Sequence, residues 1–220
     1  MERSRSGGTL GERSCSEAED APRRSDQIHR VCVYCGSKDG DSPRFLEAAG
    51  AFGRALAEHG LDLVYGGAQN GLMGALASAV LEGGRHVIGV VPRGLSHQEF
   101  AHPELSEHVL VESMSERKAM MAEKGDAYVA LPGGFGTMDE LFDMLCGAQL
   151  GLHRKPIGLL NLDGYYQPLL DWIALAVQRG FIPGALKDVL LVRTDPNELV
   201  RALLTHPQPA HPALWNARQR

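Results

Sequence analysis

The segment Leu131–Glu140, LPGGFGTMDE, has the residue types and spacing best suited to binding an anion. Gly133, Gly134 and Gly136 allow backbone angles that are closed to other residues, and they let a ligand approach the main chain. A helix after such a turn presents free N–H groups and the positive end of its dipole. No Gly-Lys-Ser/Thr follows, so this is not a Walker A loop, and the third glycine of a dinucleotide fingerprint is missing. The turn predicts a phosphate site; the alternative is a tight turn that only packs the helix on the sheet.

Charged residues close to this turn have two interpretations each. Thr137 and Glu140 have the T-x-x-E spacing of a capping box, with Glu140 folded back onto the N–H of Thr137. Spacing alone favours this over catalysis, because a carboxylate beside an anion site must face a part of the ligand that develops positive charge. Arg117 and Lys118 fall in the first half of a predicted helix, where cations oppose the dipole. They are either solvated surface charges or, for the arginine, a group aimed into the same cleft.

A second glycine-rich turn, YGGAQNGLMG at 65–74, is a weak signal by itself. Together with the turn at 133–136 it indicates a nucleotide cradled from two sides.

The elements that must position these turns alternate along the chain. Apolar runs predict strands at 30–35, 61–65, 86–91, 126–131, 157–160 and 189–192, with a weaker one at 108–112. Helices are predicted between them, from Pro43 to Gly60, over 71–82, 113–124, 137–150 and 165–179, and from Pro196. This alternation is typical of an α/β protein with a doubly wound, Rossmann-like parallel sheet and helices on both faces. Such sheets bind ligands outside the carboxyl ends of their strands, where the three turns after Cys35, Tyr65 and Leu131 would converge.

Composition bounds the rest of the molecule. The 220 residues include 22 Lys+Arg and 27 Asp+Glu, a net charge of −5, which argues against a nucleic-acid partner. No apolar run approaches the ~20 residues of a membrane helix, so no membrane partner is expected. Residues 1–29 are predicted to be a disordered tail, 30–205 a single nucleotide-binding domain, and 206–220 a Pro-rich tail. The first tail has Ser and Arg but too many acids for a transit peptide.

Metal and cofactor chemistry is not expected. Cys32-x-x-Cys35 lies within a strand, so its odd spacing places the two side chains on opposite faces. A loose cluster at His97, Glu99, His102 and His108 lacks zinc-ligand spacing. Four cysteines do not make a disulfide framework, and we therefore expect a reducing compartment, the cytoplasm.

Four motifs in order resemble those of the LOG ("Lonely Guy") family, the cytokinin riboside 5′-monophosphate phosphoribohydrolases, long mislabelled as lysine decarboxylases. The resemblance covers about 30–204. The family's P-G-G-x-G-T-x-x-E is met in full at 132–140 and its M-x-x-R-K at 114–118, while Q-L-G-x-H-x-K-P is met at 149–156. Its Y-G-G-G-x-x-G-L-M-G is met at 65–74 apart from Ala68.

The resemblance implies hydrolysis of the N-glycosidic bond of an N6-substituted adenosine 5′-monophosphate to the free base and ribose 5-phosphate, with no cofactor. It implies that Arg117 and Glu140 are catalytic, which reverses the preference for a cap, because a carboxylate beside the sugar stabilises an oxocarbenium-like charge. It also implies a homodimer. The expected substrate-binding residues are Gly36, Ser37, Gly66, Gly67, Glu99, Lys118, Gly133, Gly134, Phe135, Gly136, Thr137, Met138 and Asp139.

Departures from the family pattern bear on substrate choice. Lys38 replaces the last serine of C-G-S-S, and Cys146 and Gly147 stand where Thr and Trp are usual. The last two positions are expected to border the base pocket. The alternatives are a general AMP or purine-nucleotide nucleosidase, and a nucleotide-binding carrier protein without catalysis.

Overall fold

The computed structural model describes residues 28–95, 102–184 and 189–206, and within them the chain forms a seven-stranded, all-parallel sheet. The strand order is β4-β3-β2-β1-β5-β6-β7. Positions 1–27 and 207–220, and so nearly all of both expected tails, lie outside the described residues. The strands are β1 (Arg30–Tyr34), β2 (Asp62–Tyr65), β3 (Val87–Pro92), β4 (Glu107–Val111), β5 (Ala127–Ala130), β6 (Ile157–Leu160) and β7 (Leu190–Arg193).

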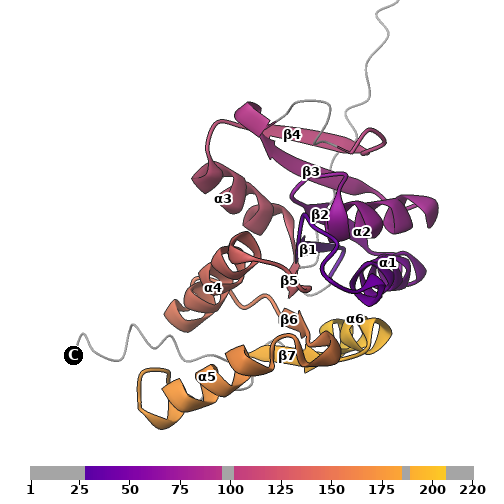
Figure 1. The fold of residues 1–220 in the computed structure, drawn as a ribbon. Coiled ribbons are helices and arrows are strands. Elements are labelled where there is room, and N and C mark those ends of the chain that lie inside the picture. Colours follow the sequence, from indigo (N-terminus) through magenta and orange to yellow (C-terminus); the bar gives the residue numbers. More distant parts are fainter. Residues whose placement is uncertain (1–27, 96–101, 185–188, 207–220) are drawn as a thin grey trace, which may run out of the picture.

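Helices cover both faces of this sheet (Figure 1). One face carries α1 (Pro43–Glu58), α2 (Gly71–Glu82) and α6 (Pro196–Thr205), and the other carries α3 (Met114–Lys124), α4 (Phe135–Leu150) and α5 (Gln167–Gln178). Two short 3-10 turns, η1 (Arg93–Leu95) and η2 (Leu162–Gly164), follow β3 and β6. The expected doubly wound α/β fold is confirmed.

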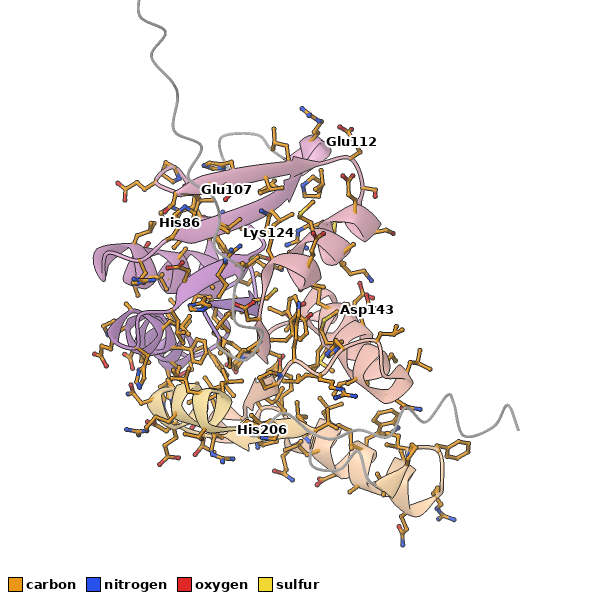
Figure 2. The ribbon with its side chains drawn as sticks, turned by 180° about the vertical axis from the view of Figure 1, so that it is seen from behind. His86, Glu107, Glu112, Lys124, Asp143 and His206 are labelled. Atoms are coloured by element: carbon orange, nitrogen blue, oxygen red, sulfur yellow. The ribbon has the colours of Figure 1, made fainter. Side chains whose placement is uncertain are left out.

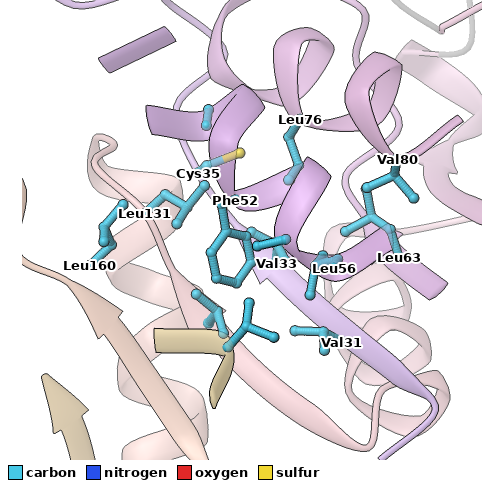
Figure 3. Packing of buried hydrophobic residues seen from close by; sticks show 14 of the residues in the cluster. Val31, Val33, Cys35, Phe52, Leu56, Leu63, Leu76, Val80, Leu131 and Leu160 are labelled. Atoms are coloured by element: carbon cyan, nitrogen blue, oxygen red, sulfur yellow. The ribbon is translucent and has the colours of Figure 1, made fainter. Parts of the chain in front are cut away.

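The central strand β1 shows why the strands have continuous apolar sequences. Val31 and Val33 point into one core, against α1, α2 and α6, while Cys32 and Tyr34 point into the other, beneath α3 and α4. Figure 3 shows the first core, in which the ring of Phe52 lies among side chains of β1 and its neighbours. Because both faces are buried, the last four residues of the strand are apolar, whereas Arg30 at its start is only partly buried. The predicted separation of Cys32 and Cys35 onto opposite faces is confirmed, since each belongs to a different core.

The burial pattern of the edge strand β4 accounts for its weak apolar sequence pattern. Its buried and exposed residues alternate, because only one side is covered. Lys124 of α3 forms an ion pair with Glu107 of this strand at 3.2 Å, and both residues are labelled in Figure 2. No helix within the described ranges is long and apolar enough to cross a membrane.

The N-terminus of α4 differs from the sequence expectation. The helix begins at Phe135, with Gly134 as N-cap, rather than at Thr137. Thr137 is therefore inside the first turn and Glu140 is in the second, so the proposed T-x-x-E capping box is wrong. The reason is that Gly134 adopts a backbone conformation (φ −95°, ψ −149°) that starts the helix without any side-chain cap. Similarly, α5 begins at Gln167 and not at Tyr165.

The order of the strands determines where the candidate site lies. From β1 the sheet grows through β2, β3 and β4 on one side and through β5, β6 and β7 on the other. The loops that leave β1 and β5 therefore meet at the topological switch point, where open α/β sheets leave a crevice for ligands. The two loops touch there, because the N–H of Gly36 donates to the carbonyl of Pro132 at 3.0 Å.

Candidate active site

A cavity of about 530 Å³ opens at this switch point, which is within the usual size range of small-molecule sites. Three walls enclose it: the turn after β1, the start of α2, and the glycine turn with the start of α4. Its lining includes nine of the residues expected from the sequence, namely Gly36, Ser37, Arg117, Gly133, Gly134, Phe135, Gly136, Thr137 and Glu140.

The glycine turn is packed so closely that a side chain would not fit at its first glycine. A Cβ on Gly133 would overlap the hydroxyl of Thr137 and lie 2.8 Å from the backbone nitrogen of Gly36. Gly134, Phe135 and Gly136 are exposed, and Phe135 is 96% exposed. The first N–H groups of the 16-residue helix α4 thus lie at the cavity, as an anion site requires.

A buried ion pair also lines the cavity. Nη1 of Arg117 lies 2.7 Å from Oε1 of Glu140, and only 9% and 6% of the two side chains are exposed. The Nε of Arg117 also donates to the carbonyl of Val90, at the end of β3, at 3.0 Å. The arginine is placed by the start of α3, where the hydroxyl of Ser113 caps the helix and accepts from the N–H of Glu116 at 3.1 Å. Both members of the pair line the cavity.

Burial and the ion pair act on Glu140 in opposite directions. Burial raises the pKa of its carboxyl, because the charged form loses water, while the Arg117 guanidinium lowers it by attraction and by its hydrogen bond. The net direction of the pKa is upward. A carboxylate held this way, in a cavity that a glycine-rich helix start also lines, can stabilise positive charge or accept a proton from water.

The first two glycines of the second glycine turn, Gly66 and Gly67, leave room for neighbouring side chains. A Cβ on Gly66 would overlap Nη2 of Arg117, so this glycine leaves room for the guanidinium. Gly67 has φ +83°, and a Cβ there would overlap the side chain of Val91. Neither glycine is among the residues that line the cavity. Their assignment as substrate contacts stays a prediction.

Three further expected residues also lie away from the cavity wall. The Nζ of Lys118 is 3.0 Å from a carboxylate oxygen of Asp139 and 2.7 Å from one of Asp143, so it joins α3 to the outer side of α4. Figure 2 labels Asp143 on that helix. Met138 is partly buried in the core beneath α4. For these positions too, direct substrate contact stays a prediction.

Sequence reasoning missed several cavity residues. Asp39, Phe45 and Tyr165 line it without having been singled out for that role. Tyr165 belongs to the connection after β6, and the rule that ligands lie at the carboxyl ends of parallel strands was the signal that could have found it.

The expected positions of Cys146 and Gly147 at the base pocket, and the loose histidine cluster, can be compared with the structure only in part. In the single chain, Cys146 lies in a separate apolar groove, and Gly147 packs against the ring of His153, so neither borders this cavity. His97 and Glu99 lie outside the described residues. Over the part of the chain that the structure describes, no three His, Cys, Asp or Glu side chains gather as metal ligands do.

Fold and site together define a Rossmann-like protein whose cavity at the switch point is lined by a glycine-rich helix start and by a buried carboxylate–guanidinium pair. Residues 73–203 match the family described as "Possible lysine decarboxylase". The chain is 48% identical over 177 residues to cytokinin riboside 5′-monophosphate phosphoribohydrolase LOG7 of Arabidopsis thaliana, covering 80% of this chain and 82% of that protein. It is 47% identical over 180 residues to LOG of Oryza sativa subsp. japonica, covering 82% and 74%. The chain belongs to the LOG family.

Solved structures agree on the fold. The molybdenum cofactor binding protein from Rippkaea orientalis superimposes with a TM-score of 0.62, covering 81% of this chain and 99% of that one, at 20% sequence identity. At this identity the likeness describes the fold alone.

Proposed function

We propose that this protein hydrolyses the N-glycosidic bond of an N6-substituted adenosine 5′-monophosphate and releases the free base and ribose 5-phosphate. The observation that carries the proposal is the Arg117–Glu140 pair, buried in a cavity that the glycine turn and the start of α4 also line. Curated relatives with nearly half of the aligned residues identical are enzymes of this activity.

The charges in the cavity fit the charge that develops in this reaction. The 5′-phosphate binds at the turn 133–137 and the N-terminus of α4, which leaves Glu140 facing the sugar. As the bond from C1′ to the base nitrogen breaks, its electron pair goes to the base and positive charge grows on the sugar. The Glu140 carboxylate stabilises that charge and takes a proton from the water that adds to C1′, while the departing base nitrogen takes up a proton, so that the net change is addition of one water across the bond.

Arg117 has a different part in this mechanism. Its guanidinium orients Glu140 and keeps the carboxyl from the full upward pKa shift that burial alone would produce. It also offers positive charge to the negative charge that develops on the leaving base.

The decisive experiment follows base release from N6-isopentenyl-AMP, from AMP and from the two corresponding nucleosides. The expected result is turnover of the monophosphates in the presence of EDTA, with N6-isopentenyl-AMP preferred. Removal of the 5′-phosphate should lower kcat/KM by about 100-fold or more, because that group supplies binding energy to the transition state. Equal rates on nucleoside and monophosphate would contradict the proposal, and a preference for AMP would support the general purine-nucleotide nucleosidase instead.

We also propose that the protein is a homodimer. A second cavity, of about 480 Å³, lies between α4, α5 and β7 and is lined almost wholly by apolar side chains. Close to it on the same helices and their ends, Leu152, Trp172, Leu175 and Phe181 are 76%, 49%, 47% and 82% exposed. Apolar surface of this kind is typical of a face covered by a partner.

We also propose a cellular compartment and the limits of the catalytic domain. Cys32, Cys35 and Cys146 are free, which supports a reducing compartment, and we assign the protein to the cytoplasm. Residues 30–205 form the catalytic domain, since the elements from β1 to α6 belong to one sheet and its covering helices.

A further inference from the structure

The connection between β6 and α5 lies against the glycine turn and makes two hydrogen bonds to its backbone. The hydroxyl of Tyr165 donates to the carbonyl of Gly133 at 2.6 Å, and the hydroxyl of Tyr166 donates to the carbonyl of Leu131 at 2.7 Å. Tyr166 is buried, whereas Tyr165 is 44% exposed and lines the cavity. Two adjacent tyrosines thus bind the turn from a segment more than 30 residues away.

Several contacts fix this connection in place. Asp163 is in the left-handed region (φ 51°) and is followed by Gly164 (φ 76°), which turns the chain back toward the sheet edge. The carboxylate of Asp163 pairs with Arg44 of α1 at 2.7 Å, and the side chain of Asn161 accepts from the N–H of Tyr166 at 2.8 Å. The ring of Phe45 meets Tyr165 edge to face, with centroids 5.8 Å apart.

The peptide group that Tyr165 holds is the one with the most rotational freedom in the turn. It joins Gly133 to Gly134, and neither residue has a Cβ to restrict it. In a trans peptide the C=O and the N–H point in opposite directions, so a bond that fixes the carbonyl of Gly133 also fixes the N–H of Gly134. Gly134 is the N-cap of α4, at the point where the anion site begins.

We propose that Tyr165 is a positioning residue for phosphate binding. Its hydroxyl holds the Gly133–Gly134 peptide in the orientation that the 5′-phosphate requires, and it neutralises part of the negative charge on a carbonyl oxygen beside the anion. The inference rests on the proposed function, because it assumes that the phosphate of the substrate binds at this turn. It assigns Tyr165 to affinity for the phosphate and not to bond cleavage.

The test compares Tyr165→Phe with Tyr166→Phe. Each substitution removes one hydroxyl that donates to a carbonyl of the same strand-to-helix connection and keeps the ring. Calorimetry with ribose 5-phosphate measures binding without turnover, and base release from N6-isopentenyl-AMP gives kcat and KM. We expect Tyr165→Phe to weaken ribose 5-phosphate binding and to raise KM by about tenfold, with kcat within a factor of about three and an unchanged melting temperature. Tyr166→Phe should lower the melting temperature, since it leaves a buried carbonyl without its partner, and should leave ribose 5-phosphate affinity unchanged.

Two results would contradict the role of Tyr165 without affecting the proposed function. In the first, the parent protein binds ribose 5-phosphate and Tyr165→Phe binds it equally tightly. The other is the same loss of affinity and of melting temperature in both variants, which would show a purely structural role. A parent protein that binds no ribose 5-phosphate would instead overturn the phosphate assignment in the proposed function, and this inference with it.

Discussion

At the scale of single residues, the structure changes the meaning of Glu140 from a helix cap to a partner of Arg117. The capping interpretation needed a helix that starts at Thr137, but α4 starts at Phe135 and the carboxylate reaches α3 instead. The pairing could not be predicted from the sequence, because 23 residues separate the two partners and only the fold brings them together. The resemblance to a family motif, and not the spacing, singled out Glu140 together with Arg117; the catalytic role that it implies for them stays a prediction.

Replacement of the charge on Glu140 should abolish turnover while leaving a folded protein. Glu140→Gln keeps the shape and a hydrogen-bond acceptor for Arg117, but it cannot stabilise a positive sugar. We expect kcat to fall by about 100-fold or more. Stability should fall by about 1–3 kcal/mol, because the buried guanidinium loses its charged partner. Base release and thermal melting on the same preparation measure both effects.

A matched control for this variant lies one turn further along the same helix. Asp143→Asn also neutralises a carboxylate of α4, but this one is about half exposed and pairs with Lys118 outside the cavity. It should change stability by less than about 1 kcal/mol and leave turnover intact. If Glu140→Gln retained more than half of the parent rate, the catalytic assignment would be wrong.

The upward pKa shift of Glu140 predicts the pH profile. If the carboxylate is the active form, kcat/KM falls toward acid pH as Glu140 takes up a proton, and the midpoint lies above the ordinary value of 4.5. Arg117 lowers this pKa, so Arg117→Gln should move the acid limb to higher pH, and Arg117→Lys should move it less. The position of the limb can be compared even though both variants turn over more slowly. A limb that stays fixed in Arg117→Gln would show that another group titrates.

At the scale of elements, the connection from β5 to α4 needs a glycine at position 133 but not at position 136. Gly133→Ala would force a methyl group against Thr137 and the backbone of Gly36, whereas a Cβ on Gly136 meets nothing within 4 Å. We expect Gly133→Ala to lose about 1–3 kcal/mol of stability. Gly136→Ala should be neutral or gain up to about 1 kcal/mol, because alanine favours the helix. Chemical denaturation of both variants would check this, and equal stabilities would contradict the packing argument.

Elements were more predictable than their ends and their contacts. Every strand was visible as an apolar run because helices cover both faces of the sheet's centre, and β4 was weak because its second and fourth residues are exposed. The turns after β1 and β5 were correctly expected to meet, since the carboxyl ends of parallel strands share one edge. The position of Lys118 was not predictable, because its two aspartate partners lie on a different helix. Tyr165 was missed because no local pattern marks a side chain that folds back over a distant turn.

At the scale of the whole molecule, the apolar groove between α4 and α5 predicts association. Trp172→Glu places a charge on this face, next to Phe142, with which the indole ring makes an edge-to-face contact. The variant should be monomeric at micromolar concentration in light scattering, while the parent is dimeric. Leu204→Glu is the control, because Leu204 is 40% exposed on α6, which covers the other face of the sheet. A parent protein that is monomeric would contradict the proposal.

The space shared by Gly66 and Arg117 restricts how this protein can evolve. The guanidinium occupies the volume that any side chain at position 66 would need, so the two positions cannot vary independently. At position 66 the order of substitutions therefore matters, because the guanidinium must move or be shortened before a side chain fits there. Gly67 stays restricted whatever residue stands at 117, since its φ is +83° and a Cβ there would overlap Val91. Shared space thus couples a glycine and an arginine that are 51 positions apart, and any substitution at 66 acts on the partner of Glu140.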